Sequence, residues 1–163
     1  LCGLEKGEIG KALMEKALML KNNVSYSYLY FLYRALETVG IYEEKEATIN
    51  ELKSLIPINC TTIPERVISP RSECHAWSAI VIYEYTSRVL GVDVFNAKEK
   101  LLIIKPYTEG RSYAKGFAGT PWGYVWCSWK KSDNGIIIDE KIPKGTKAKV
   151  VYPTGEESVI DNK

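Results

Sequence analysis

The spacing of apolar residues changes near Gly91–Ala97, and this change constrains the fold more than any other feature of the chain. Before it, apolar residues recur three and four positions apart, which is typical of helices. We expect helices over residues 5–20, 26–39, 43–55 and 73–90. After it, short apolar runs alternate with turn residues, which is typical of antiparallel sheets. The sequence therefore predicts an α+β chain in two parts, residues 1–92 and 93–163.

The second part is predicted to be an antiparallel β-sandwich. We expect strands over residues 101–105, 112–118, 124–130, 136–142 and 147–152. Alternation along the third run places Val125, Cys127 and Trp129 on one face of the strand. Ser132–Gly135 predicts a hairpin turn, because asparagine and glycine accept positive φ angles at low cost. Two further turns are expected around Gly145 and Gly155, each two residues after a proline.

The helix expected over residues 26–39 is apolar nearly all round and ends before Gly40. A helix with that profile is expected to be buried on most sides. Its tyrosines are predicted to pack in the core with their hydroxyl groups hydrogen-bonded.

Composition excludes several classes of function. The net charge is +2 and the basic residues are scattered, so we expect neither nucleic acid nor a membrane surface as a partner. The four cysteines form no C-x-x-C pair and the sequence has one histidine, so we expect free buried thiols, no metal site and no cofactor. Because the chain begins at Leu1 without methionine, we expect it to be part of a longer protein. Its compartment, cytoplasm or periplasm, is left open.

The segment Thr61–Ala79 concentrates the polar chemistry of the helical part. It contains the carboxylate of Glu65 between a proline and an arginine, the only histidine of the sequence, His75, and Trp77. Ser72 is expected to cap the helix that follows. Loops of this kind often carry functional sites, although an ordinary connection between helices has the same composition.

Two motifs in this segment resemble a known family. The sequences TTIPE, ending at Glu65, and RSECHAWSA, starting at Arg71, are similar to motifs at the end of the catalytic barrel of bacterial α-L-rhamnosidases, glycoside hydrolase family 78. The turns TPWG, from Thr120, and IPKGT, from Ile142, resemble turns of the same enzymes. The resemblance implies that residues 1–92 are the terminal helices of an incomplete (α/α)6 catalytic barrel.

The same resemblance implies roles for three side chains. Glu65 matches the general base of an inverting hydrolase, which removes terminal α-L-rhamnose from glycosides or polysaccharides. His75 and Trp77 match positions near the bound sugar. The general acid belongs to earlier barrel helices, so the chain would carry the base without the acid. We expect the parent protein to be an enzyme, the isolated chain to be inactive, and its uncovered helices to self-associate.

Alternatives remain open for each residue and for the whole chain. Glu65 could be a solvated loop carboxylate, His75 a capping or core histidine, and Trp77 a core residue. The chain could instead be a non-catalytic carbohydrate-binding module that uses Trp122, Trp126 or Trp129 as a stacking platform. Burial of most of these tryptophans would favour the hydrolase. A different (α/α)6 glycosidase or lyase is the third possibility, against which the two motifs together argue.

Overall fold

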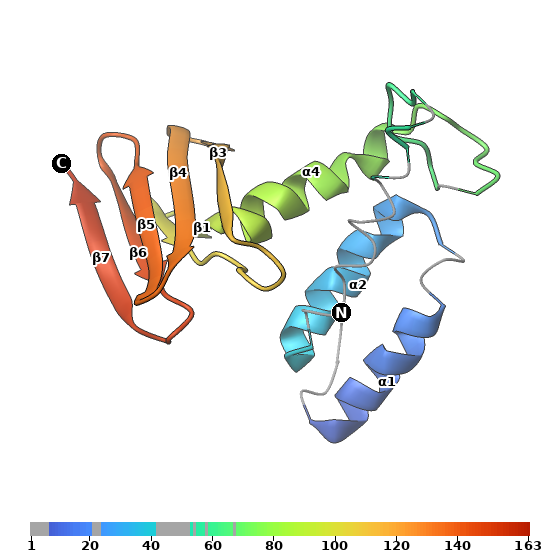
Figure 1. Ribbon diagram of the computed structural model, residues 1–163, viewed down its shortest axis with the longest axis horizontal. Helices are drawn as coiled ribbons and strands as arrows, with labels where there is room; N and C mark the ends of the chain where they lie inside the picture. Colours follow the sequence, from blue (N-terminus) through green and yellow to red (C-terminus); the bar gives the residue numbers. More distant parts are fainter. Residues whose placement is uncertain (1–6, 21–23, 42–52, 54, 58, 67) are drawn as a thin grey trace. The chain divides into compact units, whose positions relative to one another are not determined.

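The computed structural model describes residues 7–20, 24–41, 53, 55–57, 59–66 and 68–163 (Figure 1). These residues belong to two compact units, residues 1–81 and 82–163. The helix expected over residues 43–55 falls almost entirely outside the described residues. The chain is α+β, as predicted, with the helices first and two antiparallel-rich sheets after them.

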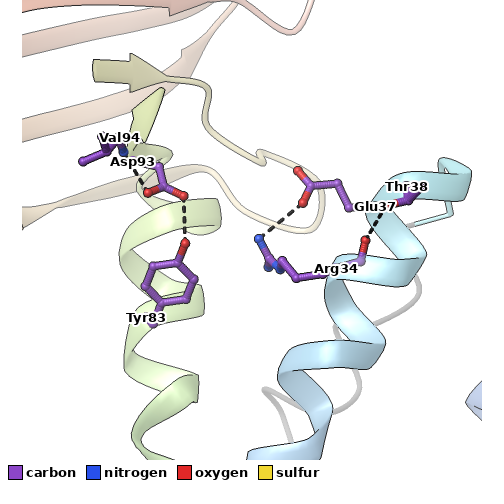
Figure 2. A network of polar contacts seen from close by, with 6 residues as sticks. All are labelled: Arg34, Glu37, Thr38, Tyr83, Asp93 and Val94. Carbon is purple, nitrogen blue, oxygen red and sulfur yellow. Dashed lines mark hydrogen bonds and ion pairs between the residues drawn. The ribbon is translucent and has the colours of Figure 1, made fainter. Parts of the chain in front are cut away.

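The first unit contains helices α1 (Glu8–Met19) and α2 (Tyr26–Val39), which lie side by side (Figure 1). One face of α2 is buried, with apolar residues at helical spacing: Tyr26, Leu29, Tyr33, Leu36 and Val39. Gly40 ends the helix in the left-handed conformation with a φ of 79°, as expected. In the last turns, Arg34 pairs with Glu37 and Thr38 Oγ1 donates a hydrogen bond to Arg34 O (Figure 2).

The expectation that α2 is buried on most sides is wrong. Tyr28 is 65% exposed and Phe31 is 55% exposed. These two aromatic residues are three positions apart, so they share one face of the helix. Their face borders a hollow rather than packed side chains, as described below.

The helix expected over residues 73–90 begins later and is irregular. It consists of the 3₁₀ turn η3 (Ala76–Ala79), the short helix α4 (Ile80–Glu84) and the π-helical turn η4 (Tyr85–Val89). Ser72 is not its N-cap, because the Ser72 hydroxyl donates to Cys74 O and His75 holds the position before η3. The π turn is closed by a 2.8 Å hydrogen bond from Leu90 N to Tyr85 O.

The second unit contains two sheets. The four-stranded sheet has the order β1 (Val92–Asn96), β2 (Leu101–Ile104), β6 (Thr146–Val151) and β7 (Glu157–Asn162), and only its β2–β6 pair is parallel. The three-stranded sheet is antiparallel, with the order β3 (Tyr113–Thr120), β4 (Gly123–Ser132) and β5 (Gly135–Lys141). The five expected strands are present, and β1 and β7 are additional.

One apolar core joins the two sheets and supports the sandwich prediction. Leu102 and Ile104 of β2 and Val150 of β6 belong to the same buried cluster as Val125 and Cys127 of β4. The predicted grouping of Val125, Cys127 and Trp129 on one face of β4 is therefore confirmed, and this face points into the core. No helix interrupts residues 101–152, all of which are described.

Trp129, the third residue on this inward face, anchors β4 to the helical turn before the sandwich. Its ring is buried, and its indole Nε1 donates a 2.8 Å hydrogen bond to Val89 O of η4. Nearby, Tyr83 Oη donates to Asp93 Oδ2, and Asp93 Oδ1 accepts from Val94 N (Figure 2). These contacts tie the end of the helical segment to β1 and β4 within the second unit.

Gly91 makes the change from helix to strand possible. Its φ is +88°, and a Cβ atom at this position would lie 2.4 Å from the backbone nitrogen of Pro106. Gly91 O also accepts a 2.8 Å hydrogen bond from Lys105 N at the end of β2. Only glycine combines the positive φ with this close approach of backbone.

The three predicted turns are present. The β4–β5 hairpin turns at Asp133 and Asn134, but Gly135 alone takes a positive φ, of 121°, and Asn134 does not. Gly145 and Gly155 also have positive φ angles, of 75° and 87°.

Candidate functional site

Backbone hydrogen bonds bring together the two ends of the loop that spans residues 63–75. Glu65 N donates to Ser72 O, and His75 N donates to Ile63 O, both over 2.9 Å. The two predicted site residues Glu65 and His75, ten positions apart in the sequence, are thereby held on neighbouring segments of one folded loop. The sequence motifs TTIPE and RSECHAWSA meet at this point.

The loop is also fixed to the start of α2. Glu65 O accepts a 3.0 Å hydrogen bond from Tyr26 N, which is one of the helix-terminal N–H groups that lack a partner within the helix. Glu65 is 5% exposed, so its interpretation as a solvated loop carboxylate is wrong. Its backbone is thus held through both its N–H and its C=O.

The Glu65 carboxylate is engaged on both oxygens by one arginine. Arg71 Nε donates to Oε2 over 3.0 Å, and Arg71 Nη2 donates to Oε1. This is the two-point pairing that the planar guanidinium group makes with a carboxylate. The two partners differ in environment, because the Arg71 side chain is 79% exposed and the Glu65 side chain is 7% exposed.

These contacts control the charge of Glu65. The hydrogen bonds from Arg71 lower the pKa of Glu65 to about 2. Burial acts in the opposite direction, and the positive charges of Arg71 and Arg66 add to the lowering. Glu65 in turn raises the pKa of Arg71. The carboxylate is therefore ionised at neutral pH, and it is a weak base while Arg71 holds it.

A hollow of about 550 Å³ lies beside the ion pair, within the first unit. All three predicted site residues line it, together with Arg71 and residues of α2. The full lining is Ser25, Ser27, Tyr28, Tyr30, Phe31, Glu65, Arg71, His75, Trp77 and Ile80. A carboxylate, an imidazole and several aromatic rings around one open space suit a ligand with both hydroxyl groups and C–H faces.

His75 and Trp77 form one side of this hollow. Their ring centroids are 5.7 Å apart, with the rings nearly perpendicular. The interpretation of Trp77 as a core residue is wrong, because the side chain is 76% exposed. His75 stands at the N-cap position of η3, yet its side chain makes no capping hydrogen bond. The structure brings Glu65, His75 and Trp77 together, and their roles stay predictions.

The part of the lining that α2 contributes was missed by sequence reasoning. Tyr28, Tyr30 and Phe31 come from the first turns of α2, which were assigned to the core. The signal available in the sequence was the excess of aromatic residues, which is more than one buried face of a helix requires.

The tryptophans of the second unit are mostly covered. Trp129 is 2% exposed, and Trp122 packs against the sandwich core. Trp126 is half-buried and lies against Phe117, with ring centroids 4.8 Å apart. This burial is the outcome that the hydrolase hypothesis requires of most of these residues.

The described part of the chain lacks two other classes of feature. Those residues include no cluster of three or more His, Cys, Asp or Glu side chains suited to a metal ion. They also include no helix with the length and hydropathy of a membrane span. Cys60, Cys74 and Cys127 are free thiols, but only Cys127 is buried, so the expectation of buried thiols holds for one of the three.

Comparison with known proteins bears on both units. Residues 100–163 match the family model described as bacterial alpha-L-rhamnosidase C-terminal domain. No curated protein matches the chain significantly. Among solved structures, the GH78 family rhamnosidase of Bacillus sp. GL1 is 25% identical with a TM-score of 0.72, over 81% of this chain and 15% of that enzyme.

Two further solved structures share the fold. The native α-L-rhamnosidase of Aspergillus terreus has a TM-score of 0.76 at 17% identity, over 94% of this chain and 20% of that chain. The Streptomyces avermitilis α-L-rhamnosidase, solved with L-rhamnose, has a TM-score of 0.56 at 18% identity, over 73% and 13%. The chain thus spans a fifth or less of these relatives, and it is similar to the C-terminal part of α-L-rhamnosidases, including one of family GH78.

Proposed function

We propose that this chain is the C-terminal part of an inverting glycoside hydrolase that removes terminal α-L-rhamnose from glycosides or polysaccharides. Glu65 is the general base, and His75 and Trp77 bind the sugar. The observation that carries the proposal is a buried, ionised carboxylate that lines one hollow together with several aromatic side chains. A rhamnosidase solved with L-rhamnose is among the structures with this fold, which supports a rhamnose-containing substrate.

Inverting hydrolysis uses two carboxyl groups, one that protonates the leaving group and one that activates water. Glu65 is the only acidic side chain among the described residues that line the hollow. The general acid is therefore supplied from outside this set of residues, by the preceding helices of an (α/α)6 barrel. The two carboxyl groups would stand about 6.5–9.5 Å apart to leave room for the water.

The other lining residues suit a sugar. Aromatic rings such as that of Trp77 present an apolar face on which the C–H groups of a pyranose can stack. The imidazole of His75 can donate one hydrogen bond and accept another while it is neutral, which matches vicinal hydroxyl groups. Tyr28 and Phe31 extend the apolar wall from α2.

The test is the turnover of Glu65→Gln with a nitrophenyl α-L-rhamnoside in the full-length enzyme that carries this chain. The amide keeps the shape of the side chain but cannot accept a proton, so kcat should fall by about 10²–10⁴-fold while KM changes little. Glu73→Gln is the matched control, because Glu73 is exposed in the same loop and does not line the hollow. Near-normal turnover of Glu65→Gln would remove Glu65 from the mechanism.

A non-catalytic carbohydrate-binding role of the sandwich is the second candidate. The observation that favours it is the outer face of β3 and β4, where Phe117 and Tyr124 are exposed beside Trp126. In that case Trp126→Ala should weaken binding of the chain to a rhamnose-containing polysaccharide in affinity electrophoresis. Unchanged retardation of the variant would exclude this face as the binding surface.

A further inference from the structure

The contact between Glu65 and Arg71 has a feature that a general base alone does not require. Both carboxylate oxygens receive a hydrogen bond from the same guanidinium group, which fixes the plane of the carboxylate as well as its position. An ionised carboxylate has about four lone-pair sites, so two remain for other donors. The arginine therefore selects which lone pairs stay available on the side of the hollow.

Few charged groups compete with Arg71 for this carboxylate among the described residues. Arg66 acts on Glu65 through its charge, and His75 lines the same hollow. From α2 the lining residues are neutral, and the titratable ones are the phenols of Tyr28 and Tyr30. Arg71 is thus the group that makes direct side-chain hydrogen bonds to Glu65.

We propose that Arg71 is the positioning residue of the reaction, which orients the Glu65 carboxylate so that its free lone pairs face the water that attacks the sugar. This inference rests on the proposed function. Arg71 affects the reaction by orienting Glu65, and Arg71 itself need not contact the sugar. The arrangement has a cost, because the same hydrogen bonds that orient the base also weaken it.

Two substitutions of Arg71 are expected to lower turnover to different extents. Arg71→Lys keeps the positive charge but loses the planar fork, so the carboxylate stays ionised and loses its fixed orientation. Arg71→Gln loses both, which leaves a buried carboxylate whose burial favours the protonated form. We expect kcat to fall about 10-fold in the first variant and about 100-fold in the second, with KM changed less than about threefold.

The pH dependence separates positioning from a merely structural role. The acid limb of kcat/KM reports the ionisation of the base in the free enzyme. Removal of Arg71 takes away the main cause of the low pKa of Glu65, so the acid limb should move to higher pH in Arg71→Gln and move less in Arg71→Lys. Arg111→Gln, in the second unit, is the control and should leave both kcat and the limb unchanged.

The experiment is the pH–rate profile of these three variants in the full-length enzyme, combined with a ¹³C carboxyl titration of Glu65 in the same enzyme. A higher pKa of Glu65 and a displaced acid limb in Arg71→Gln, with KM nearly constant, are the expected results. A raised KM with an unmoved acid limb would overturn the proposal, because Arg71 would then bind the sugar directly. A raised pKa of Glu65 in Arg71→Gln would confirm the contact between the two side chains. If Glu65→Gln nevertheless kept full turnover, the proposed function would be refuted, and the positioning role of Arg71 with it.

Discussion

Replacement of Trp129 by phenylalanine should destabilise the sandwich severely. The change deletes the hydrogen bond to Val89 O and leaves this carbonyl without its donor, at a cost of about 1–3 kcal/mol. It also removes two buried ring carbons, at about 0.8 kcal/mol each. The sum is about 2.5–4.5 kcal/mol, which should lower the midpoint of thermal unfolding by roughly 10–35 °C for a unit of this size.

The matched control is the same substitution three positions earlier. Trp126 lies on the opposite face of β4 and is only half-buried, so Trp126→Phe should cost less than about 1 kcal/mol. Thermal and urea unfolding of both variants, followed by near-ultraviolet circular dichroism, measures the difference. Equal midpoints for the two variants would refute the assignment of Trp129 to the anchor between β4 and η4.

Three further predictions concern single groups. Burial and nearby carboxylates raise the pKa of Cys127 to about 12, so a thiol reagent at pH 8 should label the exposed Cys74 and spare Cys127 until the chain unfolds. Rapid labelling of both thiols would contradict the burial of Cys127 in the sandwich core. The ion pair with Arg71 lowers the pKa of Glu65 from an ordinary 4.5 to about 2, so the contribution of this pair to folding stability is complete above pH 4.5 and is lost as the pH falls towards 2. Glu65→Gln should flatten this part of the curve of unfolding free energy against pH. An unchanged curve would contradict a stabilising ion pair between Glu65 and Arg71. The exposed rings of Phe31 and Trp77 should make the isolated chain self-associate, and a monodisperse monomer in light scattering would argue otherwise.

The fold was largely accessible from the sequence because its two parts obey different periodicities. The alternation placed Val125, Cys127 and Trp129 together on one face of β4, which the structure shows to be the inward one, and the glycines marked the turns. The strands β1 and β7 were missed because each is exposed at an edge of the sheet and lacks a clear apolar alternation. The irregular start of the helix after His75 was missed because the Ser72 hydroxyl donates to Cys74 O, while backbone hydrogen bonds of Ser72 O and His75 N to residues 63–65 keep this segment in the loop.

The sequence predicted which residues form the site better than it predicted their burial and exposure. The motifs identified Glu65, His75 and Trp77, which do line one hollow. Burial of Glu65 and exposure of Trp77 reverse the simple expectation for a carboxylate and an indole. Both depend on which elements cover the loop. Sequence spacing carries no information on such coverage.

The claim that Glu65 is the base of an inverting rhamnosidase is tested most directly by chemical rescue of Glu65→Ala in the full-length enzyme. The base activates water on the face of the sugar opposite the leaving group, so its removal should slow hydrolysis by about 10²–10⁴-fold and leave space for a small anion on that face. Added azide should restore turnover, and proton NMR should identify the product as the β-L-rhamnosyl azide of inverted configuration. Turnover at the wild-type rate without azide, or an azide product of retained configuration, would contradict the assignment.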